Sequence, residues 1–500
     1  MLTGVINTNV NALYALNSLN NTANRTNTLE QELSSGLSIN SPADNPAGYI
    51  AAQGFTSQIS GINQATSNAN QAISLVQTAD GAITQQVNIL QNILSIASQA
   101  ANGGATSQQL ASLQQVVSQL TTQVSSISSQ TNFNGVNLLD GTFQAVNFQV
   151  GAQAGQTIGL SIGSTAANQI GAYQSAGANP GIYHTDGSSA GGVADNAGAS
   201  YAITSGGVGA FTTAAAVGVS GSAGNASFAV TSATESAQGV AQAINAVTSS
   251  TNVTASADTS VAFTVTAGSV SFTLGNGTGA AQTNTAGISA TVTSVSQAGL
   301  ANLVDAINQH TGTTGVTASV NSSAQLILTQ AQGDNISIGS FAGTGTLAAG
   351  GTSTVTLAQA GTTSAVIQGL VTVQSNQSFA LAAAASDIGL KTTSALSAVS
   401  SVNVSTTAGA TAALNVINYA LQQLESVGGQ LGATQQRLQA TVANLNTTNT
   451  NLTAAQGVVQ DANIPQVTTQ LTQQEILQQA GVSALAQSST LQQSFLKLLQ

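Results

Sequence analysis

The clearest structural pattern of the sequence lies in residues 411–456, TAALNVINYALQQLESVGGQLGATQQRLQATVANLNTTNTNLTAAQ. Large aliphatic residues recur in it at an unbroken spacing of seven, at Ile417, Leu424, Leu431, Leu438, Leu445 and Leu452. Seven-residue spacing keeps one apolar stripe of a helix facing a partner helix as the two supercoil. At about 1.5 Å per residue the stripe is roughly 50 Å long, and a single helix cannot bury it. The segment therefore requires a partner.

A matching three–four alternation of apolar residues lies in the first quarter of the chain, between 59 and 97. Thr66 and Asp80 are its only polar members. The residues that we predict to form the intrachain coiled coil with 417–452 are Ile62, Ile73, Val76, Ile83 and Leu90. A further run at the same spacing covers 110–127. The two ends of the chain are thus predicted to be helical and to pack together.

The composition excludes several classes of function. Charged residues make up 4 % of the chain, against about a quarter in ordinary soluble domains, and Lys and Arg together number 4. So little positive charge argues against nucleic-acid binding. There is no cysteine and there are 2 histidines, so we expect no disulfide, no metal site and no cofactor. No catalytic motif is present and the carboxylates are scattered, so we predict that the protein is not an enzyme.

Targeting signals are also missing from the sequence. The start, MLTGVINTNVNALYAL, has neither a basic region nor a long apolar region, so we expect no cleavable signal peptide. No stretch reaches 18 apolar residues, so no membrane insertion is expected. On these grounds alone the protein would be soluble and cytoplasmic.

The middle of the chain has a different pattern. Turn dipeptides and a strand-like segment predict a small β element within 131–162, and short β-prone runs rich in Gly, Ser, Thr and Val fill 173–400. An internal repeat lies there: Ala243–Asn245 followed by Val253–Ser256 recurs 63 residues later as Ala306–Asn308 and Val316–Ser319. Each copy is predicted to be a helix packed on a small sheet, and the two modules cover about 235–275 and 298–345.

The segment LSSGLSINSPADNPA, residues 33–47, resembles the N-terminal signature of bacterial flagellins. Its loop residues that match the family motif are Ser34, Ser35, Gly36, Asn40 and Asp44. Further matches are FNG at 133–135, LLDG at 138–141, QRL at 436–438 and ILQQAG at 476–481. Together they cover roughly 1–172 and 401–500. Ile-Asn modules like those at 235–345 are found in the outer region of some flagellins.

The resemblance implies an α+β fold in which long N- and C-terminal helices pack as an antiparallel coiled-coil bundle, with a small β element and β-rich outer domains inserted between them. It divides the chain into a terminal core helix (1–43), a helical shell domain with a β-hairpin (44–172), variable outer domains (173–400), the C-terminal shell helix (401–456) and a C-terminal core helix (457–500). The terminal segments are expected to be disordered in the monomer and to order on assembly, because their apolar stripes are too small to hold a lone helix.

The resemblance further implies a structural subunit that self-polymerises into the extracellular flagellar filament for swimming, after unfolded export by the flagellar type III apparatus. Its partners would be other copies of itself, an export chaperone, and hook-associated and cap proteins. The predicted assembly interface is Val10, Leu13, Leu16, Ile464, Val467, Leu471, Ile476, Leu485 and Phe495. Two alternatives stay open: a hook–filament junction protein, and a flagellin whose outer domain adds an adhesive activity.

Overall fold

The computed structural model describes residues 9–102, 104–176, 182–184, 216–229, 236–277, 283–321, 323–349, 355–359, 365–382 and 390–498. The chain forms two compact units. The first contains Met1–Asp80, Phe143–Ser161 and Gln430–Gln500, and the second contains Gly81–Thr142 and Ile162–Gly429. No described helix is long and apolar enough to cross a membrane.

Long helices come from both ends of the chain. They are α1 (Val10–Ser35), α2 (Pro46–Ala101), α3 (Ser107–Gln130), α8 (Thr407–Gln460) and α9 (Ile464–Leu498). Local sequence explains their starts. The Asn9 side chain accepts a hydrogen bond from the Ala12 N–H and caps α1, and Thr106 forms a capping box with Gln109 before α3. Pro46 occupies the first position of α2, where its missing N–H removes no helical bond.

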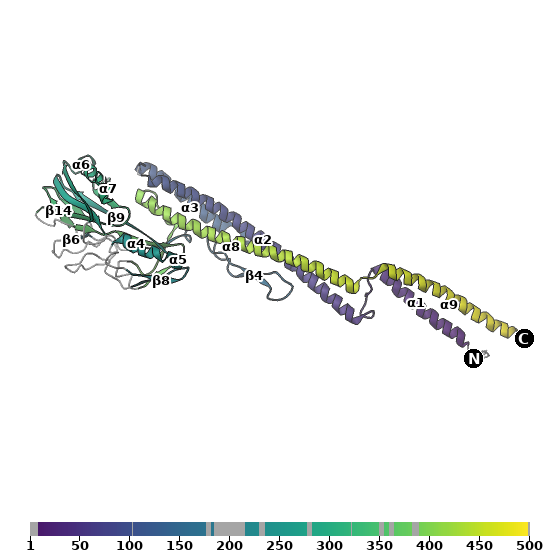
Figure 1. Ribbon diagram of the computed structural model, residues 1–500. Helices are drawn as coiled ribbons and strands as arrows, with labels where there is room; N and C mark the ends of the chain where they lie inside the picture. The colour runs from purple at the N-terminus through teal and green to yellow at the C-terminus, as the bar shows by residue number, and fades with distance from the viewer. Residues whose placement is uncertain are drawn as a thin grey trace. The chain divides into compact units, whose positions relative to one another are not determined.

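The first unit is built from two antiparallel helix pairs. Helices α1 and α9 lie side by side (Figure 1). The first part of α2 runs against the last part of α8, because Gln456 donates to Thr56 at 2.9 Å while Asn449 donates to Asn63 at 2.8 Å. A hairpin of β3 (Val146–Gln149) and β4 (Thr157–Leu160) packs on α2. There the Asn68 amide donates to the Gln149 carbonyl at 3.0 Å.

The helical part of the second unit joins α2 to α3. The side chain of Gln86 is fully buried, and its Nε2 donates to the Val124 carbonyl of α3 at 3.0 Å and to the Thr165 carbonyl at 3.3 Å. A tight hairpin of β1 (Asn132–Phe133) and β2 (Val136–Asn137) follows α3. Its turn places Asn134 at φ 51° and Gly135 at φ 81°, the geometry for which Asn-Gly is the preferred pair.

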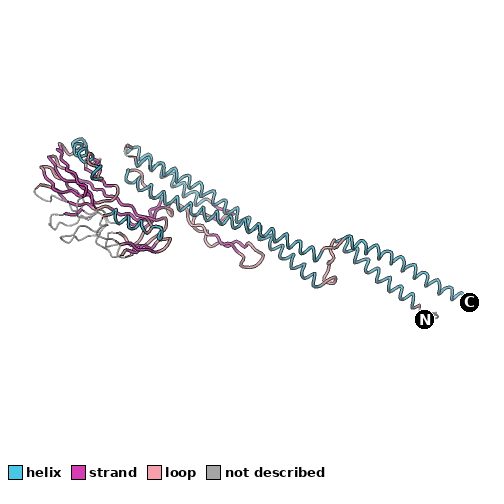
Figure 2. Tube along the Cα trace, viewed as in Figure 1, coloured by secondary structure: helices cyan, strands magenta, loops and turns pink. Residues whose placement is uncertain are grey.

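The outer part of the second unit is β-rich (Figure 2). Its eight-stranded sheet has the order β12 (Thr317–Val320), β13 (Leu326–Gln330), β9 (Thr254–Val265), β18 (Leu370–Ser375), β5 (Gly171–Ala176), β20 (Ala395–Ala398), with β15 (Leu347–Ala349) paired to β9 and β16 (Val355–Leu357) to β15. A five-stranded sheet has the order β11 (Thr283–Val292), β10 (Gly268–Gly277), β14 (Asn335–Ala342), β17 (Ala365–Ile367), β6 (Ile182–His184). A three-stranded sheet has the order β19 (Ala380–Leu381), β7 (Val217–Ser220), β8 (Asn225–Phe228).

The internal repeat appears as two copies of one local structure. Helices α4 (Ala237–Ala246) and α5 (Thr248–Thr251) precede β9, and α6 (Gln297–Asn308) and α7 (Thr311–Thr314) precede β12. Ile244 and Ile307 are fully buried in the two cores. The next residue in each copy is an asparagine whose amide bonds both backbone groups of one strand residue: Asn245 bonds Ala255 at 2.8 and 2.8 Å, and Asn308 bonds Ala318 at 2.8 and 3.0 Å. The isoleucine thus packs the helix on the sheet, and the asparagine fixes the register of the strand.

The expected α+β class, with long terminal helices and a β-rich middle, is confirmed. The stretch 411–456 lies wholly within α8, as its spacing predicts. The connection between the last two helices is short: α8 ends at Gln460, and α9 begins at Ile464.

Candidate assembly interface

The contact between α1 and α9 consists largely of small and polar side chains. Residues of reduced exposure recur on α1 at three–four spacing: Ala12, Ala15, Leu19, Thr22, Thr26 and Leu29. The matching residues on α9 are Val467, Leu471, Gln474, Gln478, Gly481, Leu485 and Ser488. We call these two sets the terminal seam. Asn9 donates to the Ser488 hydroxyl at 3.1 Å, and a Cβ on Gly481 would lie 3.5 Å from Leu19 Cδ1. The antiparallel register is therefore well defined, but little large apolar surface is buried in it.

Other large apolar side chains of the same two helices are exposed and lie outside the seam. On the first half of α1 these are Val10, Leu13, Tyr14 and Leu16, with Tyr14 71 % exposed. On α9, among the side chains described up to Thr490, they are Ile464, Ile476, Leu477 and Val482, with Ile476 61 % exposed. We call these eight residues the outer terminal stripe. Apolar side chains at this density on a paired helix indicate a surface that another chain covers.

The predicted interface residues therefore fall into three groups. Val10, Leu13, Leu16, Ile464 and Ile476 are exposed in the outer terminal stripe. Val467 is buried, and Leu471 and Leu485 are half-buried in the terminal seam. The side chain of Phe495 lies outside the described residues. Three stripe members, Tyr14, Leu477 and Val482, were absent from the sequence prediction. Tyr14 follows Val10 by four residues, a spacing that could have identified it.

The family-motif loop holds the two connecting segments together. Gly36 ends α1 with φ 73°, and its carbonyl accepts from the Ala462 N–H at 2.9 Å. The Ser38 N–H donates to the Gln460 carbonyl at 2.7 Å, so the α1–α2 and α8–α9 connections form a short antiparallel bridge (Figure 2). Ser34 is exposed, and Ser35 accepts at its hydroxyl from the Leu37 N–H at 3.1 Å. These bonds position α1 and α9 at the ends of α2 and α8.

One carboxylate organises the rest of this loop. Asp44 accepts from the N–H groups of Ser41 at 2.8 Å and Asn40 at 3.0 Å, and these bonds lower the pKa of Asp44 below its ordinary value. The Asn40 amide in turn donates to the Leu37 carbonyl at 3.0 Å. The pKa of Glu32, at the end of α1, is raised by burial and then by the charge of Asp44. The loop is thus stabilised by ionisation of Asp44 and weakened by ionisation of Glu32.

The predicted intrachain coiled coil is buried over most of its length. Ile62, Val76, Ile83, Leu90, Ile417, Leu424, Leu431 and Leu438 are 5 % exposed or less. Ile73, Leu445 and Leu452 are half-buried. A second buried series on α2, also spaced by seven, consists of Ala65, Ala72, Ala79, Gln86, Ile93 and Ala100. It lies one residue before the series that contains the predicted Ile73. Small side chains in this series allow close approach of the partner backbone.

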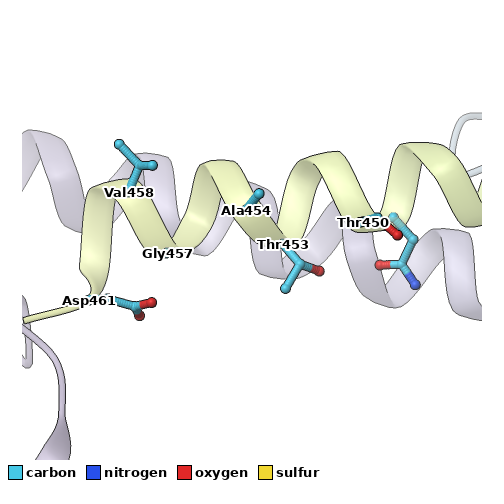
Figure 3. A pocket seen from close by; sticks show the side chains of 7 residues that line it. Thr450, Thr453, Ala454, Gly457, Val458 and Asp461 are labelled. Atoms are coloured by element: carbon cyan, nitrogen blue, oxygen red, sulfur yellow. The ribbon is translucent and has the colours of Figure 1, made fainter.

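Leu445 and Leu452 line an open groove within the first unit. Ile62 of α2 and Val150 and Ile158 of the hairpin segment form its other apolar walls. A shallower depression follows on the last turns of α8, where Val458 is 88 % exposed and projects from the helix (Figure 3). Gly457 lies beneath it, and a Cβ there would come 2.7 Å from the Asp461 carboxylate. Neither hollow gathers the acid, base and nucleophile groups that catalysis uses.

The described residues contain no group of three or more His, Cys, Asp or Glu side chains that could hold a metal ion. The features that are present are long paired terminal helices, exposed apolar side chains on them and β-rich domains between them. They define a structural subunit that assembles with other chains.

Comparison with known proteins identifies which one. The family model described as the bacterial flagellin N-terminal helical region matches residues 6–144, the C-terminal helical region matches 414–499, and the flagellin hook IN motif matches 270–332. B-type flagellin of Pseudomonas aeruginosa is 34 % identical, with 99 % of each chain covered. Flagellin B of Helicobacter pylori is 28 % identical, again with 99 % of each chain covered. The chain belongs to the bacterial flagellin family.

A solved structure of FliC from Burkholderia pseudomallei aligns with 73 % of this chain and 99 % of that one, at 20 % identity and a TM-score of 0.29.

Proposed function

We propose that this flagellin, a structural subunit of the bacterial flagellar filament, polymerises through the outer terminal stripe. The observation that carries the proposal is the exposure of Leu13, Tyr14 and Ile476 on α1 and α9, whereas the terminal seam contains mostly small and polar residues. Burying each large apolar side chain gains about 1.5–3 kcal/mol. In the single chain this gain is realised only in part for Leu13, Tyr14 and Ile476, which are 56 %, 71 % and 61 % exposed. Contact with neighbouring copies would supply it.

The same arrangement supports a coupling between assembly and folding. A helix pair held mostly by alanine, threonine and glutamine contacts, with a few leucine and valine side chains, gains a limited amount from pairing, and isolated helices are marginal in water. We therefore propose that α1 and α9 become stably ordered only when neighbouring subunits cover them. Such a chain would be easy to export unfolded, in keeping with passage through the flagellar type III apparatus without a cleaved signal.

Membership of the family supports a proposal for the domain roles and the partners. We propose core helices at 1–43 and 457–500, a shell formed by 44–172 and 401–456, and outer domains at 173–400 that face the surroundings. An export chaperone and the hook-associated and cap proteins would be its partners besides further copies of itself. The hook–filament junction alternative is not favoured, because the family models and the full-length relatives are flagellins.

Electron microscopy of the purified chain under seeding with filament fragments tests the proposal. The full chain should form long filaments, and a variant lacking 1–43 and 457–500 should not. The sharper test is the double variant Leu13→Gln, Ile476→Gln, which should raise the critical concentration for polymerisation strongly. Val295→Gln is the matched control, because Val295 is an equally exposed valine of the outer part, at 53 %. Polymerisation of the double variant at the unaltered critical concentration would overturn the proposal.

A further inference from the structure

Helix α8 meets the end of the eight-stranded sheet with two side chains one helical turn apart. Strands β9, β18 and β5 are neighbours in that sheet and antiparallel, so the start of β9, the end of β18 and the start of β5 lie at one end. Tyr419 and Gln423 of α8 reach all three strands. Residues four apart lie on the same face of a helix, so this one face addresses the whole strand end.

The hydrogen bonds are specific at each strand. The Tyr419 hydroxyl is 2.5 Å from the hydroxyl oxygen of Thr254, the first residue of β9. Gln423 uses both ends of its amide. Its Oε1 accepts from the N–H of Gly171, the first residue of β5, at 2.9 Å, and its Nε2 donates to the carbonyl of Asn376, directly after β18. Both side chains are half-buried. An amide bonded at both ends to two different strands has one orientation and holds both strands in place.

Neighbouring contacts make the site a junction and not a chance surface bond. Asn376 also accepts at its side-chain oxygen from Asn252, at the end of α5, at 3.0 Å. Gly171 has φ 151°, and a Cβ there would lie 2.1 Å from the Ser397 carbonyl, so β5 and β20 approach closely at this point. Ile417, Ala420 and Leu424, which lie on other sides of α8, are fully buried. The helix is thus packed along its buried residues as well as held to the sheet by Tyr419 and Gln423.

We infer that Tyr419 and Gln423 are positioning residues that fix the orientation of the outer sheet on α8. The outer domains then follow the helical part of the second unit as one body. A filament built from such subunits presents its outer surface in a defined orientation, whereas a chain joined only by its two connecting segments would not. This inference does not depend on how the subunits polymerise.

Distance measurement between two spin labels in the soluble chain tests it. The sequence has no cysteine, so Thr264→Cys in β9 and Asn418→Cys in α8, both exposed positions, give one labelled pair. We expect a narrow distance distribution in the parent chain and a broad one after Tyr419→Phe with Gln423→Ala. Gln422→Ala removes an exposed neighbouring glutamine and should leave the distribution narrow.

Hydrogen exchange of β9 and β18 separates loss of orientation from unfolding. If the double variant loses protection there, the single variant Tyr419→Phe, which removes one hydroxyl, replaces it. A distribution as narrow as the parent's, in a variant whose sheet remains protected, would overturn the inference. So would equal broadening by Gln422→Ala. Filaments of the folded variant should still form, but with a poorly ordered outer surface in electron micrographs.

Discussion

The asparagine of the repeated module offers the most demanding test of the structure. Asn308 donates from Nδ2 to the Ala318 carbonyl at 3.0 Å and accepts at Oδ1 from the Ala318 N–H at 2.8 Å. Asn308→Asp keeps the shape and the acceptor but loses the donor. It also places a negative charge against a carbonyl oxygen. A lost hydrogen bond costs about 0.5–1.5 kcal/mol and an unpaired acceptor about 1–3 kcal/mol, so we expect roughly 1–3 kcal/mol of destabilisation at neutral pH.

The loss should depend on pH in a defined direction. The folded module disfavours an ionised carboxylate at position 308, so the folded-state pKa of the new carboxyl lies above its unfolded value of about 3.9. Stability is therefore full below the unfolded pKa and is lost as the pH rises through the folded pKa. Below that range the protonated carboxyl has a hydroxyl that can donate to the Ala318 carbonyl, as the amide does. Acid should thus rescue this variant.

Native-state hydrogen exchange is the suitable assay, because a chain with several domains need not unfold in one step. Asn308→Asp should lower the protection of β12 and β13, and Asn245→Asp should act instead on β9 and β18. The control is Asn302→Asp, which makes the same change of charge in the same helix and leaves both bonds between Asn308 and Ala318 in place. If Asn308→Asp and Asn302→Asp gave equal protection at neutral pH, the asparagine would not fix the strand, and our account of the repeat would be wrong.

Four further predictions concern the helices and the loop. Leu438 is 1 % exposed, so Leu438→Ala should lower the free energy of unfolding of the monomer by about 2–5 kcal/mol. Leu445→Ala, at a half-buried site, should lower it clearly less. Urea unfolding followed by circular dichroism compares the two variants, and equal losses would contradict the difference in burial. The lowered pKa of Asp44 predicts that the amide protection of Asn40 and Ser41 persists at neutral pH and is lost as the pH falls through that pKa. The raised pKa of Glu32 predicts the opposite pH dependence, with stability lost as the pH rises, so Glu32→Gln should stabilise the end of α1 at neutral pH. Gly481→Ala should raise the helix content of the monomer, measured by circular dichroism. The new methyl group meets Leu19 at an ordinary contact distance, and alanine favours a helix by about 1 kcal/mol relative to glycine. Gly481→Leu should instead disrupt the terminal seam. Because the outer terminal stripe contains no charged side chain, the critical concentration for polymerisation should change little with salt concentration. A steep rise of the critical concentration in high salt would show that ion pairs hold the subunits together and would contradict this prediction.

The sequence was sufficient to predict the helical ends and their pairing. On α2 the seven-spaced residues Ile62, Val76, Ile83 and Leu90 are buried. The other half of the α2 stripe could not be assigned from hydrophobicity. Ile73 is larger and more apolar than Ala72, yet Ala72 is fully buried and Ile73 lies at the flank. Periodicity shows that a stripe exists, but the closeness of the partner backbone decides whether a small or a large side chain lies at its centre.

Buried polar residues are the second feature of the fold that the sequence could not predict. Gln86 and Ser128 are buried on α2 and α3, and sequence patterning counts such residues as exposed. Their burial depends on partners far along the chain. Gln86 donates to the Val124 carbonyl, and the Ser128 hydroxyl donates to the Leu139 carbonyl at 2.5 Å. Only the folded chain reveals these acceptors. The repeat could be recognised from the sequence, because the same residues recur 63 positions later, but the bonds of its asparagine to the strand 10 residues on appear only in the folded chain.

The terminal helices show how the two limits combine. A rule that apolar side chains pack within the chain places Val10, Leu13 and Leu16 against α9, whereas the structure places Ala12, Ala15 and Leu19 there. Threonine and glutamine can satisfy their hydrogen bonds at a partly wet seam, so the chain loses little by using them internally. Large aliphatic side chains gain when water is removed from them, and in the proposed assembly this would happen for the outer terminal stripe at a contact between chains. In a polymer every subunit has neighbouring copies, so the large apolar side chains can be kept for the contact between subunits. On this proposal, the residues that hold one subunit together and the residues that join subunits lie on different faces of the same helix. A hydrophobic pattern alone does not distinguish the two faces.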